Sequence, residues 1–128
     1  MSGELFEYAV LRAVPRPERG ERVNVGVALY CPSRGYLAVR THVDPDRLRA
    51  LCPKTDPELL ERHLSAFARV CEGGRRAGAT GELSARQRFG LVVAPRSTLV
   101  QPSPVHTGFT QDPEQTLERL LGELVLTG

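Results

Sequence analysis

Residues 22–31 of the chain read Arg-Val-Asn-Val-Gly-Val-Ala-Leu-Tyr-Cys, a run rich in β-branched and aromatic residues. Successive side chains of a strand point to opposite faces, so this run predicts a β-strand with two distinct faces. We expect one face to carry Val23, Val25, Val27 and Leu29. We expect the other face to carry Asn24, Gly26, Ala28 and Tyr30.

Similar runs lie on either side of this strand. Residues 5–14 and residues 36–43 are also rich in aromatic and β-branched residues and predict two further strands. The connecting residues 15–20 and 32–35 are short and contain proline and glycine, which suits turns. Because short connections join antiparallel neighbours, the first third of the chain predicts a three-stranded antiparallel meander.

Three Asp-Pro pairs predict the starts of three helices. Asp is a good N-cap, and Pro at the first helical position loses only an N–H that has no partner there. The pairs are Asp44-Pro45, Asp56-Pro57 and Asp112-Pro113, and the helices are expected over residues 45–51, 57–72 and 113–126.

The second of these helices, expected over residues 57–72, is a long one. Its apolar residues recur at helical spacing: Leu60, Leu64, Phe67 and Cys71, with Leu59, His63 and Val70 alongside. On the polar side, Glu58 and Arg62 are expected to form an i,i+4 ion pair.

The remaining segments complete the expected fold. Residues 73–88 contain four glycines and few apolar residues, and predict a mobile loop. Residues 89–94 and 97–101 predict two more strands. The order βββ-αα-ββ-α predicts an α+β fold in which an antiparallel sheet of about five strands packs against helices.

Length and composition suit one globular domain spanning residues 1–128, because 41% of the residues are hydrophobic and 25% are charged. The net charge of +2 is smaller than that of a typical nucleic-acid coat protein. No apolar run approaches the roughly 20 residues that a membrane span needs. The first residues also lack the basic and apolar regions of a signal peptide. We therefore expect no membrane partner.

The chain has three widely separated cysteines, Cys31, Cys52 and Cys71. Their number and spacing indicate the cellular compartment and whether a metal site is present. There is no Cys-x-x-Cys motif and no Cys/His pair at ligand spacing, so we expect no metal site, and we expect no cofactor. A few scattered cysteines suit a reducing cytoplasm, where we expect the protein to lie with all three thiols free.

A polar cluster is expected at the first hairpin. If residues 15–20 close that hairpin, Arg12 lies opposite Val23 or Asn24, and Glu21 lies at its mouth. A guanidinium, a carboxylate and an amide would then come within hydrogen-bond reach. Arg40 is a further candidate if the register of the third strand places it on the same face. The cluster is either a ligand site or an Arg–Glu bridge that pins the hairpin, and the sequence favours the bridge.

The glycine-rich segment carries the second group of candidates. Gly73 and Gly78 have the spacing of a phosphate-binding loop, but Ala79-Thr80 stands where Lys-Ser/Thr is required, so we reject that motif. A basic arm for phosphate groups is the remaining functional interpretation, and a solvated loop is the favoured one. His106 is expected in a loop after Pro104, where a polar residue is a better site candidate than one in the core. The candidate contacts are Arg75, Arg76, Arg86, Arg88 and His106.

The run Tyr8-Ala-Val-Leu-Arg12, then Pro15, then Arg19-Gly-Glu-Arg-Val-Asn-Val-Gly-Val27, resembles a bacterial family, the domain-of-unknown-function 3037 family. Its members open with a similar aromatic-x-x-x-Arg strand, a proline-containing loop and a Gly-Glu-x-x-Asn-Val-Gly-Val strand. The leucine-rich helix after Asp112-Pro113 is similar to the family's ending. The resemblance covers most of the chain and is specific over residues 8–27. It implies no established activity. It suggests a partner, a kinase-like protein related to the HipA toxin, because family members are encoded near such proteins.

Three functions are compatible with these observations. The first is a non-enzymatic binding or accessory domain, which the resemblance and the lack of a recognisable catalytic set favour. The second is a small enzyme that acts on a phosphate or nucleotide through Arg12, Glu21, Asn24 and Arg40. The third, with less support, is a nucleic-acid binder that uses the arginines of residues 73–88. The sequence leans away from an enzyme, leaves the oligomeric state open, and makes protein–protein interaction the first expectation.

Overall fold

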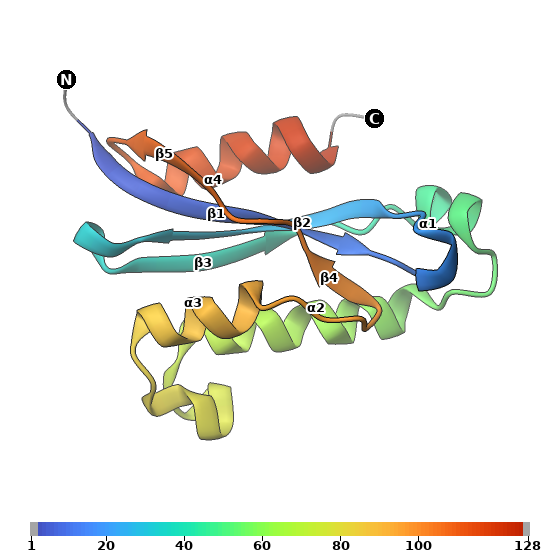
Figure 1. Ribbon diagram of the computed structural model, residues 1–128, viewed down its shortest axis with the longest axis horizontal. Helices are drawn as coiled ribbons and strands as arrows, with labels where there is room; N and C mark the ends of the chain where they lie inside the picture. The colour runs from blue at the N-terminus through green and yellow to red at the C-terminus, as the bar shows by residue number, and fades with distance from the viewer. Residues whose placement is uncertain (1–2, 127–128) are drawn as a thin grey trace.

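The computed structural model describes residues 3–126, which form an antiparallel sheet with helices on both faces (Figure 1). The order of the strands is β3-β2-β1-β4, and β5 also pairs with β1. This arrangement confirms the predicted α+β fold with a five-stranded antiparallel sheet. The strands are β1 (Glu4–Ala13), β2 (Val23–Cys31), β3 (Tyr36–Thr41), β4 (Val100–Pro102) and β5 (His106–Thr110).

The meander of β1, β2 and β3 forms as predicted. Each connection contains a short 3₁₀ turn that ends at a glycine with positive φ, Gly20 at +71° and Gly35 at +59°. Glycine adopts this conformation without the steric penalty that a Cβ atom brings. The two glycines therefore let both connections turn back within a few residues.

A β-bulge in β2 changes which side chains share a face. Leu11 of β1 pairs with Gly26, but Arg12 pairs with Asn24, so Val25 is an extra residue in β2. A bulge of this kind interrupts the alternation of side chains along the strand. The predicted faces of β2 are therefore wrong. Val23, Val25, Ala28 and Tyr30 belong to one core cluster, and Val27, Leu29 and Cys31 belong to the other.

Helices cover the two faces of the sheet (Figure 1). One face packs against α1 (Pro45–Leu51), α2 (Pro57–Glu72) and α3 (Ala85–Val93). The other face packs against α4 (Pro113–Leu121), which continues as a π-helical turn, η4 (Gly122–Leu126). The three predicted aspartate caps are confirmed, because Asp44, Asp56 and Asp112 each accept a hydrogen bond from a backbone N–H of the helix that follows.

The segment between α2 and α4 differs from the prediction. Residues 89–94 do not form a strand, because all but the last belong to α3. Ser84 and Gln87 form a capping box at the start of α3, and this reciprocal pair stabilises the helix. Within the predicted loop 73–88, Gly74–Glu82 forms two short 3₁₀ turns, η3, that meet at Gly78. Residues 97–101 contribute only the first residues of β4, and β5 was not predicted.

Ser103 joins β4 and β5 where the ladder against β1 is interrupted. Its backbone N–H donates to the carbonyl oxygen of Val10 at 2.8 Å. The backbone N–H of Val10 in turn donates to Ser103 Oγ, also at 2.8 Å. The hydroxyl therefore takes the place of a backbone acceptor, and the break between the two strands leaves the Val10 amide satisfied.

The three cysteines, Cys31, Cys52 and Cys71, are unpaired in the structure, as expected. Within residues 3–126, no helix has both the length and the apolar character that crossing a bilayer requires.

Candidate functional site

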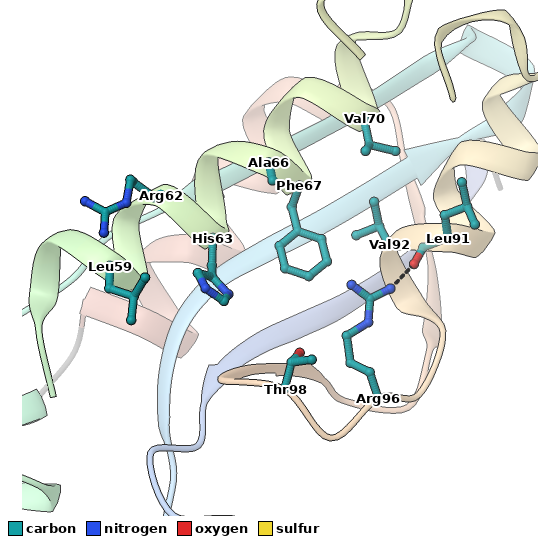
Figure 2. A pocket seen from close by; sticks show the side chains of 10 residues that line it. All are labelled: Leu59, Arg62, His63, Ala66, Phe67, Val70, Leu91, Val92, Arg96 and Thr98. Carbon is teal, nitrogen blue, oxygen red and sulfur yellow. Dashed lines mark hydrogen bonds between the residues drawn. The ribbon is translucent and has the colours of Figure 1, made fainter. Parts of the chain in front are cut away.

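An open groove with a volume of about 680 Å³ lies between α2, α3 and the residues that follow α3 (Figure 2). We call it the α2–α3 groove. Six of its lining residues are apolar, and its polar lining residues are basic or neutral. The lining residues are Leu59, Arg62, His63, Ala66, Phe67, Val70, Leu91, Val92, Arg96 and Thr98.

Helix α2 forms one wall because it carries two apolar stripes. The stripe Leu60, Leu64, Phe67 and Cys71 is buried in the core. A second stripe, Leu59, His63, Ala66 and Val70, follows the same helical spacing one position away and faces the groove. Leu59 is 40% exposed, and Leu91 on the α3 side is 42% exposed. Large apolar side chains therefore face open space at both walls.

Arg96 lies on the α3 side of the groove, opposite Phe67 of α2 (Figure 2). Its guanidinium lies over the Phe67 ring, with 4.8 Å between Cζ and the ring centroid. Its Nε donates to the Ala94 carbonyl at 3.2 Å, and its Nη2 donates to the Leu91 carbonyl near the end of α3. These contacts fix the side chain against the apolar floor, and burial lowers the pKa of Arg96 below its usual value.

The two other basic residues of the groove come from α2. Figure 2 shows Arg62 and His63 near the Leu59 end, with His63 directed toward the side where Thr98 lies. The predicted ion pair between Glu58 and Arg62 does not form. Among residues 3–126, neither Arg62, His63 nor Arg96 forms an ion pair.

The structure brings together two of the four residues of the predicted polar cluster. Arg12 and Asn24 are cross-strand partners in β1 and β2. Glu21 instead pairs with Arg19 in the exposed loop, with 2.7 Å between Oε1 and Nε. Arg40 pairs with Glu118 of α4. The predicted bridge between Arg12 and Glu21 is therefore absent.

The side chains of Arg12 and Asn24 each donate a hydrogen bond to a backbone carbonyl that is distant in sequence. Arg12 Nη2 donates to the Pro102 carbonyl at 3.2 Å, and Asn24 Nδ2 donates to the Leu124 carbonyl at 2.9 Å. Burial first, and then the nearby charge of Arg22, lower the pKa of Arg12. The buried Arg12 Nε has no hydrogen-bond partner in the described part of the chain. Ligand contact by any of the four residues stays a prediction.

The candidates of residues 73–88 also separate. Arg86 forms an ion pair with Glu7, with 2.8 Å between Nη2 and Oε2, and it covers the Tyr30 ring. Arg76 lies 3.6 Å from a carboxylate oxygen of Glu72. Arg75 is exposed.

Arg88 and His106 have contacts of their own. Arg88 Nη1 donates to the carbonyls of Val70 and Cys71, which satisfies the C-terminal end of α2. His106 begins the strand β5, where it pairs with Tyr8 of β1, so the predicted loop at this position is wrong. The rings of His106 and Tyr8 lie 5.3 Å apart, measured between centroids. Arg86 and Arg88 are therefore engaged in contacts that connect α3 to the sheet and to α2.

The α2–α3 groove offers apolar area and positive charge, which is the chemistry of a binding surface. Within the described residues, no three His, Cys, Asp or Glu side chains gather as metal ligands would. The sequence placed Leu59, His63 and Val70 beside the core stripe of α2, and this extra width was the available signal for the groove. The α3 wall had no such signal, because residues 89–94 were expected to form a strand.

A family model described as "Protein of unknown function (DUF3037)" matches residues 8–125, nearly the whole chain, and confirms the resemblance. No curated protein and no solved structure matches the chain.

Proposed function

We propose that this chain, which belongs to the DUF3037 family of proteins of unknown function, is a non-enzymatic domain that binds another protein. The α2–α3 groove is the proposed binding surface. The main support for this proposal is that Leu59 and Leu91, on the two walls of the groove, are 40% and 42% exposed. The neighbouring lining residues Phe67 and Val92 are buried, so the core itself is closed.

The composition of the groove supports this role. Protein interfaces combine an apolar centre with a polar rim and are enriched in arginine. A hydrophobic groove beside a helix is also a recurring site for an amphipathic segment of a partner. The apolar lining of the groove, with arginines from α2 and from the segment after α3, matches both descriptions.

The alternative functions have less support because their residues are engaged elsewhere. An enzyme that acts on a phosphate or nucleotide would need Arg12, Glu21, Asn24 and Arg40 at one place. Two of these four hold backbone carbonyls, and the other two form separate ion pairs. A nucleic-acid binder would need the arginines of residues 73–88, of which Arg86 and Arg88 hold α3 in place.

We place this role in the bacterial cytoplasm, where three free thiols are stable. The first partner to test is a kinase-like protein related to the HipA toxin, which the family resemblance suggests.

The experiment compares groove variants with a matched surface variant. Leu59→Ser and Leu91→Ser each replace a groove leucine, and Leu126→Ser replaces a leucine that is 50% exposed at the end of η4, the turn that follows α4. The tagged chain is expressed in its native cell, and co-purifying products of neighbouring genes are quantified by mass spectrometry. Partner affinity is then measured by calorimetry with purified proteins.

We expect each groove variant to bind the partner about tenfold more weakly, since central apolar residues dominate interface energies. Leu126→Ser should bind like the wild type. Equal capture by all four proteins, at unchanged melting temperature, would reject the groove as the binding surface.

A further inference from the structure

Arg96 is a half-buried cation without a counter-charge. Its partners are two backbone carbonyls and the face of the Phe67 ring, all of which are neutral groups. No carboxylate lines the α2–α3 groove, and none pairs with Arg96 anywhere in residues 3–126. A carboxylate that enters the groove beside Arg96 would therefore gain a charge-assisted hydrogen bond, and a bound partner would cover the pair and exclude part of the water that weakens such pairs.

The other polar residues that line the groove contribute no negative charge. Arg62 and His63 lie on α2, and neither forms an ion pair among the described residues. Thr98, the remaining polar lining residue, carries no charge. The groove thus presents an apolar floor with Arg62 near its Leu59 end and Arg96 on its α3 side, and it favours an occupant whose polar edge is acidic.

The shape of the groove favours a helix as that occupant. It follows α2 from Leu59 to Val70, a distance of about 16 Å at a rise of 1.5 Å per residue. Three turns of a second helix have the same length, and a helix places apolar residues at i, i+3, i+4 and i+7 on one side. Figure 2 shows Leu59 at one end of this stretch of α2 and Ala66, Phe67 and Val70 toward the other.

We propose that the occupant of the α2–α3 groove is an amphipathic helix of a partner protein that carries acidic side chains beside its apolar stripe, one of them pairing with Arg96. This inference rests on the proposed function and specifies its partner. The apolar stripe covers Leu59, Phe67 and Leu91. The acidic side chain supplies the counter-charge that Arg96 lacks within the chain.

The test uses three synthetic helical peptides with one shared leucine pattern at i, i+3, i+4 and i+7. They differ only in the residues that flank the leucines, which are Glu, Gln or Lys. Binding to the full chain is measured by fluorescence anisotropy, and the contacted residues are identified by NMR shift changes. In a separate experiment, dodecanoate is titrated into the chain and its binding is measured by NMR shift changes. Dodecanoate carries a carboxylate on an apolar chain, so it distinguishes a small amphiphile from a peptide helix.

We expect the Glu peptide to bind about tenfold more tightly than the Gln peptide, with the Lys peptide weakest. Arg96→Met should remove most of the preference for Glu, with Arg62 accounting for the remainder, while the Gln peptide binds as before. Arg96→Lys keeps the charge and should retain most of the preference. Arg69→Met is the matched control, because Arg69 is an exposed arginine of α2 outside the groove, and it should bind like the wild type. Melting temperatures verify that each variant is folded.

Several outcomes would overturn the inference. Equal binding of the Glu and Gln peptides, with both lost in Leu59→Ser, would reject the acidic partner and keep the groove as a protein-binding surface. Binding of dodecanoate without any peptide would identify a small amphiphile as the occupant. Failure of all three peptides at millimolar concentration would also reject an acidic helix, and partner capture by the groove variants would then decide the proposed function separately.

Discussion

Arg12 and Asn24 are neighbours across β1 and β2, yet each donates its side-chain hydrogen bond to a carbonyl far along the chain. Arg12 reaches Pro102 in β4 at 3.2 Å, and Asn24 reaches Leu124 in the C-terminal turn at 2.9 Å. The pair therefore connects the central hairpin to two segments that follow it by about ninety residues or more in sequence. These contacts give both residues a structural role.

Arg12→Ala should destabilise the protein by about 1–3 kcal/mol, because the part-buried Pro102 carbonyl loses its donor. Arg12→Met should cost less, since it keeps the aliphatic stem and removes the buried Nε that has no partner in the described residues. Urea denaturation of both variants measures the difference. Wild-type stability of Arg12→Ala, combined with loss of a ligand, would instead support a binding site at this position.

Ser103→Ala should destabilise the protein by about 1–3 kcal/mol, because it leaves the buried Val10 N–H without an acceptor. The Val10 amide should also exchange its hydrogen faster, which NMR detects. Ser97→Ala is the matched control, because Ser97 is exposed and its substitution should leave stability unchanged. Equal stability of the two variants would contradict the role of Ser103 between β4 and β5.

Alanine at two glycines should have opposite effects. A Cβ at Gly26 would lie 3.0 Å from the Arg40 carbonyl oxygen and 3.0 Å from Thr41 Cγ2, so Gly26→Ala should cost about 1–3 kcal/mol. A Cβ at Gly90 in α3 meets no atom within 4 Å, and Gly90→Ala should stabilise by about 0.5–1 kcal/mol. Thermal melts test both signs, and a stabilised Gly26→Ala would show that the bulge tolerates a side chain.

Trypsin should cut first after Arg75 or Arg76, in the glycine-rich turns of η3, whose few apolar residues favour local opening. Arg86 and Arg88 lie in α3 and are held by Glu7 and by the end of α2, so cleavage there should come later. Mass spectrometry of early fragments measures the order. First cleavage at Arg86 or Arg88 would show that α3 opens before η3, against this expectation.

Iodoacetamide should label Cys52 first. A hydrogen bond from the Thr55 side chain, with backbone hydrogen bonds nearby, lowers the pKa of Cys52, and the thiolate is the reactive form. Burial raises the pKa of Cys71 to about 12, so that thiol should stay unlabelled until the protein unfolds. Peptide mapping over a range of mildly alkaline pH checks this order, and early labelling of Cys71 would show that α2 opens in the native state.

Local signals were sufficient for much of the fold. The three aspartate caps and the β-branched runs of the meander strands depend on a few neighbouring residues, and the caps and strands appear at the expected places, although the bulge changes the faces of β2. Residues 89–94 misled the prediction because a short apolar run suits a buried strand and a buried helix alike. The strand β5 contains few apolar residues, and its conformation depends on pairing with β1, about a hundred residues earlier.

The candidate site was less predictable from sequence. The wide apolar face of α2 was visible, but a groove also needs a second wall. That wall comes from α3 and Arg96, whose positions depend on the chain between residues 73 and 98. The polar cluster predicted at the hairpin also depended on tertiary structure, and its four residues do not come together. Glu21 has a closer partner in Arg19, and the bulge at Val25 changes which side chains share a face.

The sequence by itself determined where helices begin, where the meander turns and which family the chain belongs to, because these depend on short runs of residues. Only the tertiary structure decided the partner of each arginine. A long guanidinium side chain reaches whatever acceptor the fold brings near, as Arg40 reaches Glu118 and Arg12 reaches Pro102. Arg96 ion-pairs with no carboxylate among residues 3–126, and that absence follows from the packing of α2 against α3 and the residues after α3.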